Sequence, residues 1–418
     1  MKDSGIDWIG KIPDEWEINK IDSLYTLRNT KVSDKNYPPL SVTMKGIVPQ
    51  LATAAKSDDG DNRKLVKKGD FVINSRSDRR GSSGISNYDG SVSLINTILT
   101  PRGKMNPDYY NWLFHTVQFE DEFYKWGHGI VDDLWTTRWQ DMKNISVLVP
   151  PEEAQEKIAG FLDKKCSEID SIIEESKKSI EEYKAWKQSV IFEAVTGKNL
   201  SCKKKNSGIE WLGEIPETWE VKRFKCIIDS LEKGNGITKD EVFSDGDTFC
   251  VRYGEIYSKY DTSFENCFSK TFKDKIPVKK YFSNGDLVFV GTGELVEEIG
   301  KCVAYLGNEQ CLSGGDIIIA KHKQNAKFLS YAMNSHYAQA QKSCGKAKLK
   351  VVHISATEIG NVLLALPPLS EQESIAKFLD EKCAQIDSLI SEKQSLIKDL
   401  AEYKKSLIFE AVTGKRRV

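Results

Sequence analysis

Long apolar runs, metal-ligand spacings and closely paired cysteines are missing from this chain of 418 residues. No uninterrupted stretch of about 18 apolar residues occurs, so we expect no membrane-spanning helix. The first residues, Met1-Lys2-Asp3-Ser4-Gly5, do not open a secretory signal, and we expect a cytoplasmic protein. The nine cysteines include no C-x-x-C pair, and the five histidines show no H-E-x-x-H spacing. We therefore expect reduced thiols and no bound metal.

Known catalytic motifs are absent as well. The sequence contains neither a G-x-x-x-x-G-K phosphate loop nor a G-x-G-x-x-G dinucleotide loop. Asn36-Tyr37-Pro38-Pro39 has the letters of the N-P-P-[YF] motif in the wrong order, and we interpret it as a turn. The dipeptide Pro107-Asp108 is not followed closely by the E-x-K of nucleases. We expect no catalytic residue in this chain and no cofactor bound to it.

Charge of one sign is not in excess. The chain has 60 basic and 61 acidic residues, which gives a formal net charge of −1. The chain as a whole is therefore not a basic nucleic-acid binder. Any such binding must come from local basic clusters that acidic segments offset elsewhere.

The sequence contains an internal repeat. Residues 4–17 return as residues 207–220 with nine of fourteen positions identical, and residues 150–170 return as 367–387 with thirteen of twenty-one identical. The segment IFEAVTGK occurs unchanged at 191–198 and at 408–415. The middles of the two halves share little. Each half is thus a variable domain between two constant segments, and we expect one half to have arisen from the other by duplication.

In each half, the second of the two constant segments predicts a long helix. Apolar residues recur at alternating steps of three and four, and Glu and Lys fill most other places, which is typical of a coiled-coil seam. About 45 residues at 1.5 Å each give a helix of about 65 Å. The predicted seam comprises Leu162, Ile169, Ile172, Tyr183, Trp186 and Val190 in the first copy, and Leu379, Ile386, Leu389, Leu396, Leu400, Tyr403 and Leu407 in the second.

Two such helices in one chain supply each other with a partner. We expect an antiparallel intramolecular coiled coil, and a parallel dimer between two chains is the alternative. The repeated tryptophans Trp8, Trp16, Trp211 and Trp219 either pack against these helices, which we favour, or form a docking surface. The predicted domains are residues 1–149, a helix at 150–198, residues 199–366 with a linker, and a helix at 367–418.

The variable domains have an α+β pattern. Lys68-Gly69-Asp70 and Asn284-Gly285-Asp286 are turns that precede short apolar strands, and residues 316–320 predict a fully buried strand. Helices are expected within 107–126 and 326–342. The fold class is therefore α+β, with two pseudo-symmetric α/β domains joined by the two long helices.

Polar, glycine-rich loops follow the matched strands in both halves, at 74–84 and 291–301, and a second polar segment comes later in each half, at 126–129 and 341–350. Arginine can grip the O6 and N7 atoms of guanine, whereas lysine and serine suit phosphates and base edges. For any single loop, an ordinary solvated turn is the simpler interpretation, and the matched positions in both halves favour DNA binding. The candidate DNA-binding residues are Arg76, Arg79, Arg80, Ser82, Ser83 and His128 in the first half, and Thr292, Gly293, Lys346, Lys348 and Lys350 in the second.

The whole chain resembles the specificity subunit of type I restriction–modification systems. The resemblance rests on two variable domains between repeated helices, on Pro367-Pro368 followed by Glu371-Gln372 and residues 375–380, and on the matching block at 150–163. The first copy departs from it at Ala154, where the second has Glu371. The tryptophan-containing segments at 8–16 and 211–219 fit as well.

This resemblance implies a sequence-specific DNA-binding subunit that is not itself an enzyme. Each variable domain would be a target-recognition domain that reads half of an asymmetric, bipartite site in double-stranded DNA. The helices would act as a ruler and bind two adenine-methyltransferase (modification) subunits. Restriction/translocase subunits would complete the assembly, and S-adenosylmethionine, ATP and Mg²⁺ would reside on the partner subunits. The alternatives are a non-catalytic scaffold with two protein-binding heads and an enzyme with a scattered site of its own.

Overall fold

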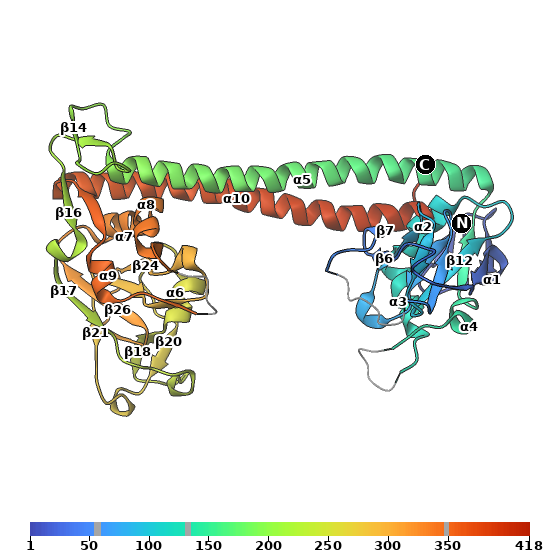
Figure 1. The fold of residues 1–418 in the computed structure, drawn as a ribbon, viewed down its shortest axis with the longest axis horizontal. Coiled ribbons are helices and arrows are strands. Elements are labelled where there is room, and N and C mark those ends of the chain that lie inside the picture. The colour runs from blue at the N-terminus through green and yellow to red at the C-terminus, as the bar shows by residue number, and fades with distance from the viewer. Residues whose placement is uncertain (54–59, 130–134, 347–350) are drawn as a thin grey trace. The chain divides into compact units, whose positions relative to one another are not determined.

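The computed structural model describes residues 1–53, 60–129, 135–346 and 351–418. The chain divides into two compact units: unit 1 is Met1–Lys177 with Gln394–Val418, and unit 2 is Lys178–Lys393. Each unit holds one α+β head and a part of both long helices, α5 (Glu152–Thr196) and α10 (Leu369–Val412) (Figure 1). Within the described residues, no helix is both long enough and apolar enough to cross a membrane.

The head of unit 1 is built on a four-stranded antiparallel sheet in the order β10-β9-β12-β4. Its strand β9 has the sequence FVIN and is almost fully buried, because both faces of the sheet are covered. The strands are β4 (Tyr25–Arg28), β9 (Phe71–Asn74), β10 (Ser83–Ile85) and β12 (Asn96–Pro101). A smaller sheet contains β5 (Lys31–Val32), β8 (Arg63–Val66) and β11 (Gly90–Val92), and β6 (Leu40–Thr43) pairs with β7 (Gly46–Pro49).

The head of unit 2 repeats this order with one strand added. Its main sheet runs β17-β26-β22-β24-β19, and β19 alone pairs in parallel. These strands are β17 (Ile228–Lys233), β19 (Ser263–Phe264), β22 (Leu287–Val290), β24 (Cys302–Tyr305) and β26 (Ile317–His322). The second sheet contains β18 (Thr248–Val251), β20 (Ser269–Thr271), β21 (Tyr281–Phe282) and β25 (Cys311–Ser313), beside α6 (Tyr253–Lys259).

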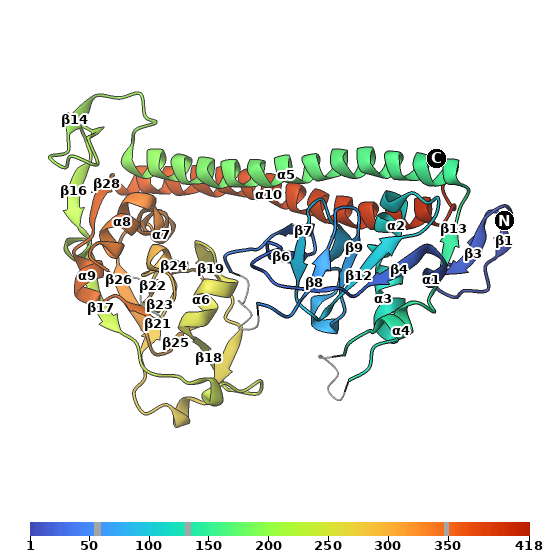
Figure 2. The same cartoon turned by 45° about the vertical axis from the view of Figure 1, so that its right-hand side comes forward.

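The two heads therefore share a common fold. Strands β4, β12, β9 and β10 of unit 1 occupy the same sheet order as β17, β26, β22 and β24 of unit 2. Figure 2 labels all of these strands except β10. The expected α+β class with two pseudo-symmetric heads is confirmed. The strand predicted at 316–320 begins one residue later, at Ile317: Ile317, Ile318, Ile319 and Ala320 are all buried, whereas Asp316 is partly exposed and has a φ of 58°.

Two consecutive helices follow the main sheet in each head. They are α2 (Pro107–Phe114) and α3 (Val117–Lys125) in unit 1, and α7 (Ala326–Asn334) and α8 (His336–Ser343) in unit 2. Each expected helical range is thus divided in two. In unit 1 the division falls at Thr116, whose hydroxyl accepts a hydrogen bond from Phe119 N and so starts a new helix.

Short strand pairs frame each head. Residues at the two ends of a head meet where β3 (Glu17–Lys20) pairs with β13 (Ser146–Val149), and where β16 (Glu220–Arg223) pairs with β28 (Leu363–Leu366). The remaining short elements are β1 (Lys2–Asp3), β2 (Lys11–Ile12), α1 (Ile21–Leu24), α4 (Trp139–Met142), β14 (Lys204–Asn206), β15 (Glu214–Pro216) and α9 (Ala356–Gly360).

The long helices pair in antiparallel fashion within each unit. In unit 1 the ammonium of Lys404 contacts Asp170 at 2.6 Å, and in unit 2 that of Lys187 contacts Asp387 at 2.8 Å. In both pairs the residue numbers add to 574, as an antiparallel register requires. The two pairs are also equivalent positions of the internal repeat. The expected antiparallel intramolecular pairing is confirmed.

The predicted seam needs a correction at five positions. Leu162, Ile169, Leu379, Ile386 and Leu407 are buried, and Tyr183, Val190 and Leu400 are partly buried. Ile172, Trp186, Leu389, Leu396 and Tyr403 are 36–49% exposed. Cys166 and Ser176, which the heptad pattern left out, are buried instead. The helices bury one face against each other and against a head, and a heptad pattern alone does not tell this face from a second apolar stripe.

The repeated block attaches each head to a long helix. Gln155 and Gln372 are equivalent and almost fully buried, and their amide oxygens accept hydrogen bonds from Asn106 N (2.9 Å) and Asn325 N (3.0 Å), the N-cap residues of α2 and α7. About two helical turns further along each long helix, Trp112 donates to Asp163, and Tyr331 donates to the equivalent Asp380. The matched residues of this block are therefore those that join head and helix.

The tryptophan-containing segments close the ends of the helices. A Cβ added at Gly414 would approach Pro13 to 2.6 Å and Trp16 to 3.0 Å, and one added at Gly197 would approach Pro216 to 2.4 Å and Trp219 to 3.2 Å. Both glycines have a φ near +70°, which favours glycine at a helix end. Trp16 and Trp219 are buried, as the packing interpretation predicts, whereas Trp211 is 44% exposed and stacks on Tyr337.

Candidate nucleic-acid interface

The same two loops come together in both heads. In unit 1 the loop after β9 pairs with the segment after α3, through single β-bridges of Thr136 with Arg76 and with His128. In unit 2 the loop after β22 forms β23 (Thr292–Gly293), which pairs with β27 (Val352–His353) in the segment after α8. The loops predicted to bind DNA thus occupy equivalent places in two copies of one fold.

Three arginines lie on the first of these loops. A short 3₁₀ turn, Ser77–Arg79, is anchored because Ser77 N donates to Trp135 O and Arg76 N donates to the side chain of Asn74. The Nε atoms of Arg76 and Arg79 lie 2.9 and 3.7 Å from the two carboxylate oxygens of Asp78. Arg79 is the most exposed of the three arginines, with 67% of its side chain accessible.

Arg80 has different surroundings. Its terminal Nη2 donates to the carboxylate of Asp121, and its guanidinium carbon lies 5.3 Å from the ring centre of Tyr124. The bond to Asp121 raises the pKa of Arg80. Arg80 is therefore held by residues of α3, whereas Arg76 and Arg79 contact Asp78 of their own loop.

The two serines and the histidine predicted in the same half differ in accessibility. Ser82 and Ser83 are buried, and the hydroxyl of Ser83 lies 3.2 Å from Nε2 of His115. Both serines support the loop from beneath. His128 is exposed over 69% of its side chain and lies 3.4 Å from Asp141.

The predicted residues of unit 2 are more enclosed. The hydroxyl of Thr292 lies 3.0 Å from Nδ1 of His353, and a Cβ at Gly293 would meet the hydroxyl of Tyr257 at 2.6 Å. The ammonium of Lys346 donates to His353 O and to Glu358, each at 2.7 Å. Lys348 and Lys350 lie outside the described residues.

Two lysines of unit 2 have a structural role that the sequence did not indicate. Lys342 is 2% exposed and donates to Gly300 O at 2.7 Å, and burial lowers its pKa to about 8. Lys301 donates to Tyr260 O at 2.6 Å, and burial lowers its pKa as well. Both ammonium groups tie the loop after β22 to the body of the head. Composition alone does not separate these lysines from those facing solvent.

The ion pair of Lys346 predicts a pH-dependent contribution to stability. Burial by itself would raise the pKa of Glu358, but hydrogen bonds from Lys346 and from the amide and hydroxyl of Ser355 lower it to about 2. A lowered pKa stabilises the fold above the unfolded value of about 4.3, and this stabilisation disappears as the pH falls towards the folded value. We expect Glu358→Gln to destabilise the chain at pH 7 and to match the wild type near pH 2.

Urea unfolding, followed by circular dichroism at pH 7, 5 and 3, measures the gap in unfolding free energy between the wild type and Glu358→Gln. Lys346→Met is the matched variant, and its gap should likewise shrink in acid. A gap between wild type and Glu358→Gln that does not change with pH would contradict the assignment.

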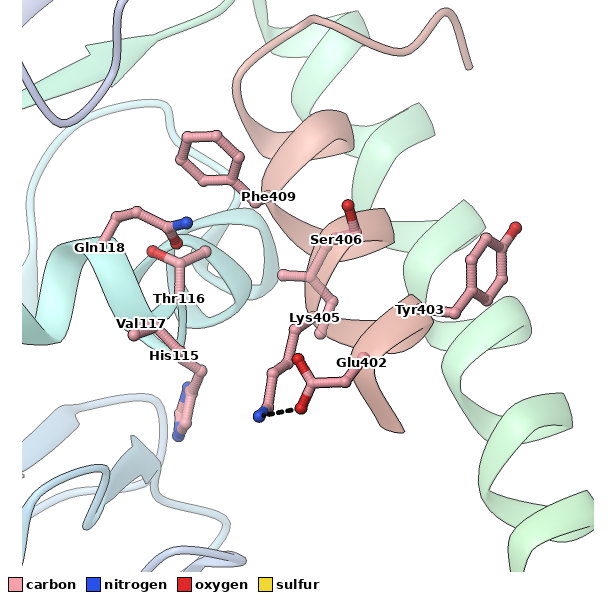
Figure 3. Close-up of a pocket in the computed structure, with 10 residues that line it drawn as sticks. His115, Thr116, Val117, Gln118, Glu402, Tyr403, Lys405, Ser406 and Phe409 are labelled. Atoms are coloured by element: carbon pink, nitrogen blue, oxygen red, sulfur yellow. Dashed lines mark hydrogen bonds and ion pairs between the residues drawn. The ribbon is translucent and has the colours of Figure 1, made fainter. Parts of the chain in front are cut away.

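A second surface lies on the long helices. In unit 1 a cleft of about 670 Å³ separates the α2–α3 turn from α10, and Figure 3 shows His115 facing the ion-paired Glu402 and Lys405, whereas the ring of Tyr403 points away. In unit 2 a cleft of about 740 Å³ is lined by the equivalent stretch of α5, including Gln188 and Ile191, and by His336 at the start of α8. Tyr403 and Trp186, which are equivalent in the repeat, lie on the helix stretches that border these clefts, and both are about half exposed.

The described part of the chain contains no group of three or more His, Cys, Asp or Glu side chains that could hold a metal ion. All nine cysteines are free.

Comparisons with known proteins agree with this architecture. The family described as "Type I restriction modification DNA specificity domain" matches the chain twice, at residues 13–182 and 216–399. The MjaVIII type I restriction enzyme specificity subunit of Methanocaldococcus jannaschii is 24% identical over 98% of this chain and 94% of its own length. The putative MjaX specificity subunit of the same organism is also 24% identical, over 98% of this chain and 96% of its own length.

Solved structures show the same fold. A chain from a study of complex assembly and conformational transition of the type I restriction–modification system superposes with a TM-score of 0.75, at 15% identity, over 97% of this chain and all of that one. The crystal structure of the HsdS subunit from Thermoanaerobacter tengcongensis gives a TM-score of 0.56 at 15% identity, over 97% of this chain and 98% of that one.

Proposed function

The chain belongs to the type I restriction–modification DNA specificity family, and from this premise we propose that its two heads read the two unlike halves of one DNA site. The chain is a DNA-recognition subunit of such a system. The observation that carries the proposal is that one pair of loops recurs in both heads with different side chains: arginines in unit 1, and threonine, glycine and lysine in unit 2. Unlike loops on a common fold predict an asymmetric, bipartite site with an unread spacer.

Selection from a randomised pool of double-stranded DNA tests this proposal. The full chain, together with its co-expressed partner subunits, should enrich two short, different sequences separated by a fixed number of unspecified base pairs. Methylome sequencing of the host with the gene deleted and restored should give the same site. A palindromic or continuous site would contradict the proposal, and the absence of any enriched sequence would favour a protein-binding scaffold.

We further propose that the long helices recruit two modification subunits. The exposed aromatic side chains Trp186 and Tyr403 occur once in each unit at equivalent positions, each on the stretch of long helix that borders a cleft. Exposed aromatic residues next to a concave surface are typical of binding hot spots. Two equivalent surfaces on one chain suit two copies of the same partner, because each copy can make the same contacts.

On this proposal, the chemistry resides in the partners. Modification subunits would supply S-adenosylmethionine-dependent methylation of adenine, and restriction/translocase subunits would supply ATP- and Mg²⁺-dependent movement and cleavage. This chain would catalyse neither reaction. We expect it to act in the cytoplasm, where it would meet cellular DNA.

Replacing the two aromatic residues should remove the partners one at a time. Trp186→Ala and Tyr403→Ala should each weaken one of two modification-subunit sites, by about 30-fold if the residue is a hot spot worth about 2 kcal/mol. The double variant should carry no modification subunit at micromolar concentration. Native mass spectrometry measures the stoichiometry directly. Val278→Ala, which truncates another exposed apolar side chain in unit 2, is the control, and equal stoichiometry in all variants would contradict this assignment.

A further inference from the structure

The carboxylate of Asp78 in unit 1 contacts two arginines, and in both of them the nearest atom is Nε. The Oδ1 atom of Asp78 lies 2.9 Å from Nε of Arg76, and its Oδ2 atom lies 3.7 Å from Nε of Arg79. Nε is on the inner side of the guanidinium group. Among the described residues, no terminal nitrogen of Arg76 or Arg79 donates a hydrogen bond to another residue, so these nitrogens, which form the fork of the side chain, stay available to a ligand.

The terminal fork is the part of arginine that recognises guanine. Its two nitrogens match the O6 and N7 acceptors in the major groove, and a bidentate pair of this kind is the most common specific contact between protein and DNA. The side chains of Arg76 and Arg79 are 38% and 67% exposed, so solvent reaches both of them, and Asp78 is 32% exposed. An arginine that is already oriented loses less side-chain entropy when it binds.

Arg80 lacks this arrangement, although it is adjacent in sequence. Its Nη2 atom is engaged by Asp121, and its guanidinium group lies over the ring of Tyr124. Its fork is thus partly occupied within the head. The loop therefore separates three neighbouring candidates into two that share Asp78 and one whose terminal nitrogen is bonded to Asp121.

We propose that Asp78 is a positioning residue that presents Arg76 and Arg79 to guanine bases in the half-site read by unit 1. This inference rests on the proposed function and deepens it, since it names the base and selects two arginines out of three. Asp78 also lowers binding to arbitrary DNA, because a carboxylate beside the fork repels phosphates. Removing it should therefore weaken discrimination more than overall affinity.

The test compares DNA selection by the full chain carrying Asp78→Asn, Asp121→Asn or Arg79→Lys with selection by the wild type. Asp78→Asn should reduce the preference for guanine in the first half-site by about tenfold, within the range of about 5- to 150-fold that a lost bidentate contact gives. It should leave the second half-site unchanged and increase affinity for a duplex of arbitrary sequence. Asp121→Asn removes the same charge from the same head and should leave the guanine preference intact.

Arg79→Lys keeps the charge but removes the fork. It should lose the guanine preference while the dependence of binding on salt concentration stays the same, which a merely structural role would not produce. Guanine preference that survives in both Asp78→Asn and Arg79→Lys would overturn the inference, as would a first half-site without guanine. A wild type that enriches no sequence at all would overturn the proposed function instead.

Discussion

Removing one matched heptad from each long helix should shorten the spacer of the DNA site by about three base pairs and leave both half-sites unchanged. Seven residues at 1.5 Å span about 10.5 Å, which is about three base pairs of 3.4 Å. Both α5 and α10 run through the two compact units, so they are the segments that join the heads. If they act as a ruler, their length decides which spacer allows both heads to bind.

The antiparallel register decides which residues to delete. Because partner numbers add to 574 at Asp170–Lys404 and at Lys187–Asp387, deletion of 175–181 together with 393–399 retains every remaining pairing. The variant should lose most of its affinity for the original site and gain affinity for the shortened one. Selection from a pool with randomised spacer lengths measures both. Deletion of 175–181 alone shifts the register and is the control, which should bind neither site well.

An unchanged spacer in the matched deletion would contradict the ruler. So would loss of either half-site sequence, because sequence reading is assigned to the heads and not to the helices. A spacer shortened by about three base pairs also rotates one half-site relative to the other about the DNA axis, by the twist of those base pairs. A second matched deletion, of two heptads, separates the two effects, because its shift of about six base pairs is close to half of a helical turn of about 10 base pairs.

The architecture was predictable because it is recorded twice in the sequence. The repeat at 150–170 and 367–387 predicts two equivalent helices, and Lys404–Asp170 and Lys187–Asp387 are the contacts that such a repeat generates. The equivalence of Gln155 and Gln372 was visible as an identity, but not as a buried link to the N-caps of α2 and α7. That link depends on residues about 50 positions away in the chain.

The surfaces were harder to predict. The heptad pattern placed Trp186 and Tyr403 in the seam, whereas both are about half exposed, because an apolar stripe looks the same whether it meets a helix of its own chain or a partner. For the loops, sequence fixes the residue types but not their ion pairs. From the sequence, Asp78 and Asp121 both look like acidic residues exposed to solvent. In the structure, Asp78 contacts Arg76 and Arg79, whereas Asp121 binds Arg80. The DNA-binding assignments of all these residues stay predictions.

Alanine substitutions in the unit 1 loop should weaken one half-site and leave the other intact. Arg76→Ala and Arg79→Ala each remove one bidentate contact, which costs about 1–3 kcal/mol. Together they should reduce affinity for the complete site by at least about 30-fold, since 2 kcal/mol is about one and a half powers of ten. The two side chains share Asp78, so we expect the double variant to depart from additivity.

Arg80→Ala separates base reading from general loss of the loop. It removes a side chain that is bonded to Asp121 and stacked near Tyr124, so it should lower stability slightly without altering the selected sequence. Fluorescence anisotropy with duplexes that change one half-site at a time measures each contribution. If Arg80→Ala abolishes the guanine preference while the Arg76 and Arg79 variants keep it, the division of the three arginines is wrong. If all three variants bind every duplex as the wild type does, the reading surface of unit 1 lies elsewhere on the head.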